Sequence, residues 1–243
     1  MRKILVTGGA GFLGRYLVKH LRVKYPKDKV DVVDYYGVGS ASFIEGHRTD
    51  LVNLKSHAAM YKIAYRDYDL VFHLAAETHV DRSIEDPAPF IHSNILGTIA
   101  ILELFKGENT EIIHMSTDEV VEHRPPITQG LDKPSFYRPK ESEVKFSPTN
   151  PYAATKAAAE MMIMAYRKTY NMPITVVRCT NMYGPGQFPE KLVAKTISNC
   201  LLGRPIGVYG KGEQYRDYLY VGDACTALDL ISQQKPGQDF HIS

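Results

Sequence analysis

The sequence predicts a doubly wound α/β fold, in which helices cover both faces of a parallel sheet. Short apolar runs typical of buried strands alternate with helical stretches along the whole chain. The first run, Lys3–Thr7, leads into a glycine-rich turn and then into a helix. No internal repeat interrupts this order. Alternating strands and helices need crossover connections, and such connections produce a parallel sheet.

The predicted elements of the first half follow one another regularly. We expect strands at Lys3–Thr7, Lys29–Asp34, Phe43–Leu51, Asp69–Glu77 and Glu111–Met115, a helix from the glycine-rich turn to about Lys24, and a helix at Phe90–Lys106. Pro87 and Pro89 favour the start of the second helix, because proline is tolerated in a first helical turn.

The second half begins with residues 122–150, where prolines and charges predict a long surface loop. After that loop we expect helices at Pro151–Tyr170, at about Leu192–Leu202 and from Asp223 onward, strands at Pro173–Arg178, Ile206–Tyr209 and Tyr218–Val221, and a loop at Asn181–Lys191.

Composition excludes several classes of protein. The chain has 243 residues, 44% hydrophobic and 23% charged, which suits a globular protein with a sizeable core. Its 29 basic and 27 acidic residues give a net charge of +2, so we expect no nucleic-acid partner. No apolar run is long enough to span a bilayer. Because Met1–Val6 leads directly into a strand, we also expect no signal segment and no membrane association.

The cysteine and histidine spacing predicts neither disulfides nor a metal site. Cys179, Cys200 and Cys225 lie far apart and are odd in number, which indicates reduced thiols in a cytoplasmic protein. The nine histidines show no metal-ligand spacing, so we expect no protein-bound metal.

A glycine-rich turn after the first strand predicts a dinucleotide site. Gly8, Gly11 and Gly14 allow the backbone to approach a pyrophosphate at the positive end of the following helix. Asp34 ends the second strand, 20 residues after Gly14. A carboxylate there accepts hydrogen bonds from ribose hydroxyls and repels a 2′-phosphate, which favours NAD over NADP.

Residues suited to acid–base chemistry follow the fifth strand. Thr117, Asp118 and Glu119 lie where the carboxyl end of a strand meets the ligand crevice. Tyr152 and Lys156 are four residues apart, and that spacing places both on one face of a helix. These five residues around a nicotinamide would form an oxidation site with an added acid/base pair.

Six segments of the sequence resemble the corresponding segments of the dTDP-glucose 4,6-dehydratases. These enzymes are extended short-chain dehydrogenase/reductases with a Rossmann domain. The segments are Thr7–Gly14, His73–Ser83, Ser116–Val120, Pro151–Lys156, Arg178–Leu192 and Tyr215–Val221. The resemblance runs from end to end. It implies a NAD-binding domain at 1–178 and part of a substrate-binding lobe at 179–243, with short strands that return to the main sheet.

The resemblance also implies a three-step reaction that makes a nucleotide-linked 4-keto-6-deoxy sugar for deoxysugar biosynthesis. Tyr152, as phenolate, would take the proton of the sugar C4 hydroxyl, and Lys156 would assist its ionisation and hold the nicotinamide ribose. Glu119 would remove the C5 proton, and Asp118 would protonate the departing C6 hydroxyl. Thr117 would hydrogen-bond the C4 oxygen.

Carried over by position, the resemblance implies two sets of contacts. The cofactor would meet Gly8, Gly11, Phe12, Leu13, Gly14, Asp34, Tyr35, Tyr36, Gly37, Asp50, Leu51, Leu74, Ala75, Ala76, Thr78, Ser93, Tyr152 and Lys156. The nucleotide-sugar substrate would meet Thr78, Thr117, Asn181, Glu190, Lys191, Leu192, Gly207, Val208, Tyr209 and Arg216. Arg216 suits a diphosphate, since a guanidinium can grip phosphate oxygens with two hydrogen bonds.

The resemblance has departures and leaves alternatives open. Val121 follows the acid pair where the family has Tyr-Gly, and Met182 stands where the family has Asn. The family continues beyond the equivalent of Ser243, so the chain is a fragment, or another chain completes its pocket, or that pocket is unused. A nucleotide-sugar 4-epimerase or decarboxylase, or a non-catalytic NAD-binding scaffold, is the alternative function. The resemblance further implies a homodimer, joined by a four-helix bundle of the helices near Phe90–Lys106 and Tyr152–Tyr170.

Overall fold

A parallel seven-stranded sheet forms the centre of the molecule. The computed structural model describes residues 1–34, 49–51, 67–121, 144–208, 210–212, 214 and 216–243. The strand order is β3-β2-β1-β4-β5-β6-β9, and every neighbouring pair is parallel. The strands are β1 (Lys3–Thr7), β2 (Lys29–Asp34), β3 (Thr49–Leu51), β4 (Leu70–His73), β5 (Glu111–Thr117), β6 (Ile174–Cys179) and β9 (Asp239–Ile242).

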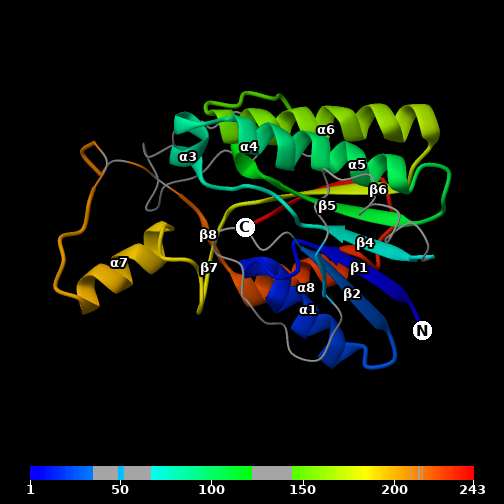
Figure 1. Ribbon diagram of the computed structural model, residues 1–243, viewed down its shortest axis with the longest axis horizontal. Coiled ribbons are helices and arrows are strands. Elements are labelled where there is room, and N and C mark those ends of the chain that lie inside the picture. Colours follow the sequence, from blue (N-terminus) through cyan, green and yellow to red (C-terminus); the bar gives the residue numbers. More distant parts are fainter. Residues whose placement is uncertain (35–48, 52–66, 122–143, 209, 213, 215) are drawn as a thin grey trace, which may run out of the picture.

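Helices cover both faces of this sheet (Figure 1), which confirms the predicted doubly wound fold. On one face lie α1 (Phe12–Lys24) and α8 (Val221–Ile231), which pack against each other. On the other lie α3 (Val80–Glu85), α4 (Ala88–Phe90), the π-helix η1 (Ile91–Leu96), α5 (Gly97–Leu104) and α6 (Pro151–Tyr170).

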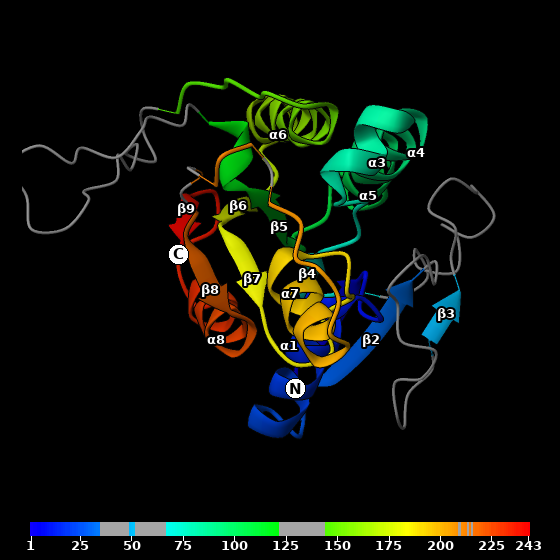
Figure 2. The ribbon, with the colours of Figure 1, turned by 90° about the vertical axis from the view of Figure 1, so that its left-hand side faces the viewer.

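A smaller group of elements lies at one end of the sheet. It consists of α7 (Leu192–Leu201) and of two short paired strands, β7 (Asn181–Tyr183) and β8 (Tyr218–Tyr220). Figure 1 shows α7 at the end opposite the N-terminus, where β1 begins, and Figure 2 looks onto that end. Since all strands of the main sheet are parallel, this group lies toward their carboxyl ends.

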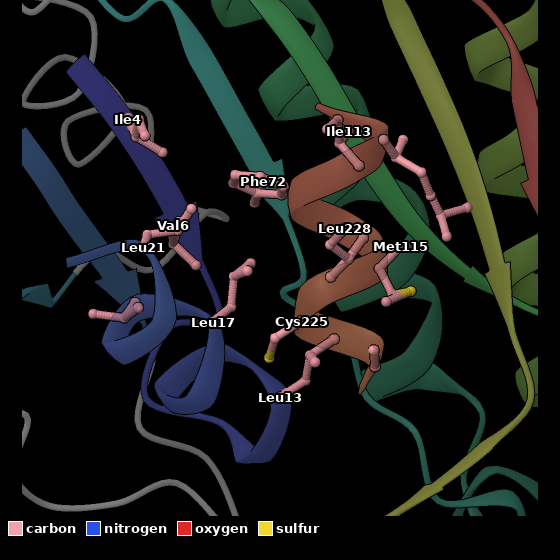
Figure 3. Close-up of a cluster of buried hydrophobic side chains, with 14 of the residues drawn as sticks. Ile4, Val6, Leu13, Leu17, Leu21, Phe72, Ile113, Met115, Cys225 and Leu228 are labelled. Atoms are coloured by element: carbon pink, nitrogen blue, oxygen red, sulfur yellow. The ribbon is translucent and has the colours of Figure 1, made fainter. Parts of the chain in front are cut away.

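The central strands β1, β4, β5 and β6 are buried on both faces, which explains their continuous apolar sequences. Ile4 and Val6 of β1 face the cluster beneath α1 and α8 shown in Figure 3, whereas Leu5 faces the cluster beneath α5 and α6. Ile113 and Ile112 of β5 divide in the same way.

Several predicted boundaries are wrong. The helix predicted at Phe90–Lys106 is divided into α4, η1 and α5, and β4 ends at His73 rather than Glu77. The predicted loop at Asn181–Lys191 begins with β7, and Ile206–Val208 form no strand. Short strands such as β7 depend on pairing with a distant partner, which local sequence does not reveal.

Other predictions fall wholly or partly outside the described residues. These are the first part of the predicted Phe43–Leu51 strand, most of the 122–150 loop, and Tyr209. The division of the chain at residue 178 stays a prediction, although β9 joins the main sheet beside β6.

A buried polar network joins β1, β4 and the π-helix. The Thr98 hydroxyl donates to the Asn94 carbonyl (2.6 Å), so it accepts from Nε2 of His73 (3.2 Å). Nδ1 of His73 therefore accepts from the Thr7 hydroxyl (2.7 Å). Burial, together with the charge of Lys156, lowers the pKa of His73 to about 3. This imidazole is consequently neutral in the folded protein.

Asn94 extends the network to α6. Its side-chain oxygen accepts from the Glu77 N–H (2.9 Å), and its nitrogen donates to the Glu77 carbonyl and to the Thr155 hydroxyl, each at 3.0 Å. Thr155 donates in turn to the carbonyl of Tyr152 (2.7 Å). The π-helix, a form often found at functional sites, thereby ties the chain after β4 to the first turn of α6.

The neutral His73 predicts acid sensitivity that His73→Gln should reduce. Because the folded pKa lies below the unfolded one, the unfolded chain binds more protons below pH ~6.5. Stability is therefore lost as pH falls, by about 1.4 kcal/mol per pH unit for this residue. We expect His73→Gln to be less stable at pH 7 and to lose stability less steeply between pH 6 and 4, as measured by urea unfolding.

The exposed His92 provides the control when unfolding is measured at protein concentrations too low for association. Its side chain is then in solvent in both states, so His92→Gln should keep the wild-type slope. An unchanged slope in His73→Gln would contradict the assignment of a neutral buried imidazole.

Candidate active site

The glycine-rich turn brings three backbone segments together without intervening side chains. Gly8 has a φ of +70°, and a Cβ at this position would lie 2.7 Å from the backbone nitrogen of Ala75. A Cβ on Gly14 would collide with the Gly8 carbonyl oxygen. The ends of β1 and β4 and the first turn of α1 can meet only because these positions are glycine. The result is a shallow cradle of backbone at the carboxyl end of β1.

The cradle has the polar groups that a dinucleotide needs. Gly11 caps α1 without a side-chain hydrogen bond, and no acidic residue lies in the first turn of this helix. Its amino-terminal N–H groups can therefore bind phosphate oxygens. Asp34 is buried at the end of β2, where one carboxylate oxygen accepts from the Ala10 N–H (2.8 Å). These residues fit NAD.

The predicted catalytic residues converge at the carboxyl end of β5. Thr117 is the last residue of β5, and Asp118 and Glu119 form the short 3₁₀ helix η2 (Asp118–Val120) that follows. Tyr152 lies in the first turn of α6, and its phenol lies beside Thr117, Asp118 and Glu119, which all act on its pKa. The structure therefore brings the threonine, both acids and the tyrosine to one place.

Asn150 links the acid pair to α6, a role that sequence reasoning missed. Its side-chain oxygen caps α6 by accepting from the Ala153 N–H (2.8 Å), and its nitrogen donates to Glu119 (2.9 Å). The signal was present in the sequence, because Asn directly before Pro and a helical run is a common N-cap.

The electrostatics of the site oppose ionisation of Tyr152. Burial raises the pKa of its phenol strongly; the charges of Glu119 and Asp118 raise it further, and the hydrogen bond with Thr117 lowers it. Lys156 was expected to assist ionisation. Its ammonium instead donates to the Met115 carbonyl (2.6 Å) and lies 3.4 Å from Nε2 of His114. The phenol is therefore protonated in this arrangement.

A second group of residues approaches the same place from α3 and the turn before α7. Glu190 pairs with Arg82 and lies 3.8 Å from His79. The Lys191 ammonium donates to the Thr78 carbonyl (2.8 Å). Burial lowers the pKa of Lys191, whereas the charges of Glu190 and Glu119 raise it. Sequence reasoning missed Arg82 and His79, although both lie in a segment that carries the resemblance.

The remaining predicted contacts are only partly described. Ser93 lies half-buried on η1, Leu13 is buried, and Phe12, Asn181 and residues 74–76 are half-buried. The exposed ones are Thr78, Leu192, Gly207, Val208 and Arg216. Tyr35, Tyr36, Gly37 and Tyr209 lie outside the described residues, as do the side chains of Asp50 and Leu51.

Two searches of the described residues gave negative results. No group of three or more His, Cys, Asp or Glu side chains in this part of the chain could hold a metal ion. No helix in it is both long enough and apolar enough to cross a membrane.

Comparison with known proteins gives relatives over nearly the whole chain. The chain is 38% identical to dTDP-glucose 4,6-dehydratase of Salmonella typhimurium over 263 residues, which is 99% of this chain and 71% of the relative. Its structure is similar to that of dTDP-glucose 4,6-dehydratase from Bacillus anthracis in complex with NAD. That similarity has a TM-score of 0.84 and 32% identity, and covers 100% of this chain and 75% of the other.

An epimerase has a similar fold at lower identity. The structure of UDP-glucose 4-epimerase from Thermotoga maritima matches with a TM-score of 0.87 and 29% identity, covering 99% of this chain and 76% of the other. The model of the NAD dependent epimerase/dehydratase family matches residues 4–243. This match agrees with the cradle for a dinucleotide and with the tyrosine and lysine of α6. The chain belongs to the NAD dependent epimerase/dehydratase family.

Proposed function

We infer that the protein is a nucleotide-sugar 4,6-dehydratase, an NAD-dependent hydro-lyase that acts on dTDP-glucose or a related hexose. The observation that carries this inference is the meeting of the acid pair Asp118 and Glu119 with Tyr152 at the end of β5. Oxidation of a sugar hydroxyl needs one base, whereas loss of water across C5–C6 needs a further base and an acid. The named relatives, which are dTDP-glucose 4,6-dehydratases, support the same conclusion.

The proposed roles of the residues are those that the resemblance implies, and the positions of the side chains support them. The chemistry supplied by bound NAD is hydride acceptance from C4 and hydride return to C6. Tyr152 takes the C4 hydroxyl proton, and Thr117, beside the phenol, orients the C4 oxygen. Glu119 removes the C5 proton and Asp118 protonates the leaving C6 hydroxyl. The high pKa of free Tyr152 means that the phenolate requires positive charge nearby, which Lys156 and the nicotinamide ring are suited to provide.

The contacts around the acid pair support a distinct role for each acid. Glu119 accepts a hydrogen bond from Asn150, and its charge raises the pKa of Lys191. Asp118 accepts a hydrogen bond from the Thr117 hydroxyl (3.3 Å). The two side chains therefore lie in different hydrogen-bonding surroundings, as an acid and a base in one site require.

Loss of the acid pair should abolish dehydration. We expect wild-type protein with dTDP-glucose and NAD to form the 4-keto-6-deoxy product, measured by its absorbance in alkali. The double variant Asp118→Asn with Glu119→Gln should slow formation by about 10²–10⁴-fold, because a general acid or base contributes that much. Tyr152→Phe should lose activity in the same range.

Glu108→Gln is the matched control. Glu108 is exposed in the turn before β5, at the amino end of the sheet, so this variant should keep wild-type activity. If the wild type forms only the 4-epimer, the proposed dehydratase function is wrong and the protein is a 4-epimerase. No product with NAD still bound would favour the non-catalytic scaffold.

We also propose a homodimer through the outer surface of α6 and the π-helix. Met161 and Met164 of α6 are 53% and 52% exposed, and Leu96 of the π-helix is 46% exposed. Ala154 and Ala165 are also exposed on α6. Small residues permit close approach of helices and the methionines supply apolar surface, which suits a bundle with the same helices of a second copy.

Substitutions that introduce charge on this outer surface of α6 should prevent dimerisation. Met161→Glu with Met164→Glu would bury like charges at a two-fold interface, so sedimentation at micromolar protein should show monomer where the wild type is a dimer. Leu201→Glu is the control, since Leu201 is 82% exposed on α7, away from this surface. A monomeric wild type would remove the proposal.

The cytoplasm remains the proposed compartment. All three cysteines are free, with Cys179 and Cys225 buried. Free thiols are typical of a reducing environment.

A further inference from the structure

A buried cluster of charges that has no part in the proposed mechanism connects α6 to three strands. Ser116 of β5, Arg178 of β6 and His241 of β9 are partners in the sheet register, so they form a row across neighbouring strands. Glu160 of α6 meets the middle of this row. Nε of Arg178 donates to Oε1 (3.2 Å) and Oε2 (3.0 Å) of Glu160, and a terminal nitrogen donates to Oε2 (2.5 Å).

The cluster is almost fully removed from water. Arg178 is 2% exposed and Glu160 is 0% exposed. The Ser116 hydroxyl also donates to Glu160. On its far side, Arg178 donates to Asp239 (3.1 Å) and to Nε2 of His241 (3.3 Å). Replacement of such buried ion pairs by apolar residues is often neutral or stabilising, so stability alone is a weak reason for the cluster.

Glu160 lies close to two parts of the candidate site. It is four residues after Lys156, which is four residues after Tyr152, so the three side chains form one stripe along α6. Ser116, which donates to Glu160, directly precedes Thr117. The carboxylate therefore touches the strand that carries the acid pair and lies one helical turn from the lysine.

Glu160 supplies the negative charge that acts on Lys156. The groups that face this ammonium from β4 and β5 are His73, His114 and the Met115 carbonyl. Burial lowers the pKa of both histidines, so they are neutral. Burial lowers the pKa of Lys156 to about 8, and the charge of Glu160 opposes that fall.

We propose that Glu160, held by Arg178, is a positioning residue that keeps Lys156 in its ammonium form and fixes the Tyr152–Lys156 face of α6 against β5. Its carboxylate accepts three hydrogen bonds from Arg178 and one from Ser116, so it is held in place one turn from the lysine. The inference rests on the proposed function, because the ammonium matters through Tyr152 and the cofactor.

Direct titration of Lys156 tests the proposal without turnover. In protein with ¹³C-labelled lysine, the Lys156 signal is assigned with Lys156→Arg and followed by NMR from pH 6 to 11. Removal of a nearby opposite charge lowers the pKa of a lysine, so Glu160→Gln should titrate about one unit or more below wild type. An unchanged midpoint overturns the proposal.

Asp239→Asn is the matched control. It removes a charge from the opposite side of Arg178 and from Arg167 but leaves Glu160 in place. We expect its Lys156 midpoint to stay near that of wild type. An equal downward shift in Asp239→Asn would mean that loosening of the cluster, rather than the charge of Glu160, moves the titration, and the proposal would fail.

Glu160→Gln removes the negative charge that pairs with the buried Arg178 guanidinium, so this variant can fail to fold. The double variant Glu160→Gln with Arg178→Met removes both charges together, which buried ion pairs tolerate better. It should also titrate below wild type, and a midpoint at or above that of wild type counts against the proposal.

The pH profile of kcat distinguishes this proposal from the proposed function. In Glu160→Gln, the alkaline limb should move to lower pH, in the same direction as the Lys156 midpoint, whereas a merely structural role would lower kcat at every pH. If wild-type protein forms no keto-sugar product, the dehydratase assignment is wrong, and the Lys156 titration still tests the role of Glu160. If the wild type forms product and the alkaline limb of the kcat profile does not move in Glu160→Gln, only the proposed role of Glu160 is wrong.

Discussion

Burial of polar side chains at the carboxyl ends of β4, β5 and β6 is the constraint on which the rest of the site depends. Each such group has to be hydrogen-bonded inside the protein, because water is excluded from it. On one side His73 bonds to Thr7 and Thr98, and Asn94 donates to Thr155. On the other side Arg178 donates to Glu160. Together the two sets hold α6 in one position relative to the sheet.

The same burial creates the chemical difficulty of the site. Low polarity and two neighbouring carboxylates make the Tyr152 phenolate costly, yet the proposed reaction needs both the phenolate and the acids. In the proposed reaction, Lys156 and a bound cofactor would have to supply the positive charge that offsets that cost. Burial lowers the pKa of Lys156 to about 8, and the charge of Glu160 opposes that fall. Such opposed shifts are typical of catalytic sites.

The likeness to an epimerase shows how much of this frame is independent of the final reaction. The overall fold is shared by proteins named as a dehydratase and as an epimerase, at TM-scores of 0.84 and 0.87. Overall shape therefore does not separate the two reactions. In the proposed function, Asp118 and Glu119, on a single turn after β5, are the groups that would add dehydration chemistry to the shared oxidation site.

Strand and helix periodicity were enough to predict the fold class, and three elements, at Lys3–Thr7, Lys29–Asp34 and Pro151–Tyr170, have the predicted bounds. Their apolar patterns and end signals are local, so the sequence contains them fully. The glycine spacing and the Tyr152–Lys156 spacing are local in the same sense, and the sequence alone placed both on the correct elements.

Other features depend on residues far apart in the chain. The pairing of β7 with β8, the π-helix and the edge strand β9 arise from contacts that no short segment specifies. The helix cap by Asn150 could be foreseen, but its bond to Glu119 could not. By itself the sequence determined the fold class and the chemical groups of the site. Only the tertiary structure decided that Lys156 rests against Met115 and His114, and that Glu160, one helical turn after this lysine, binds Arg178, because burial and charge act through space.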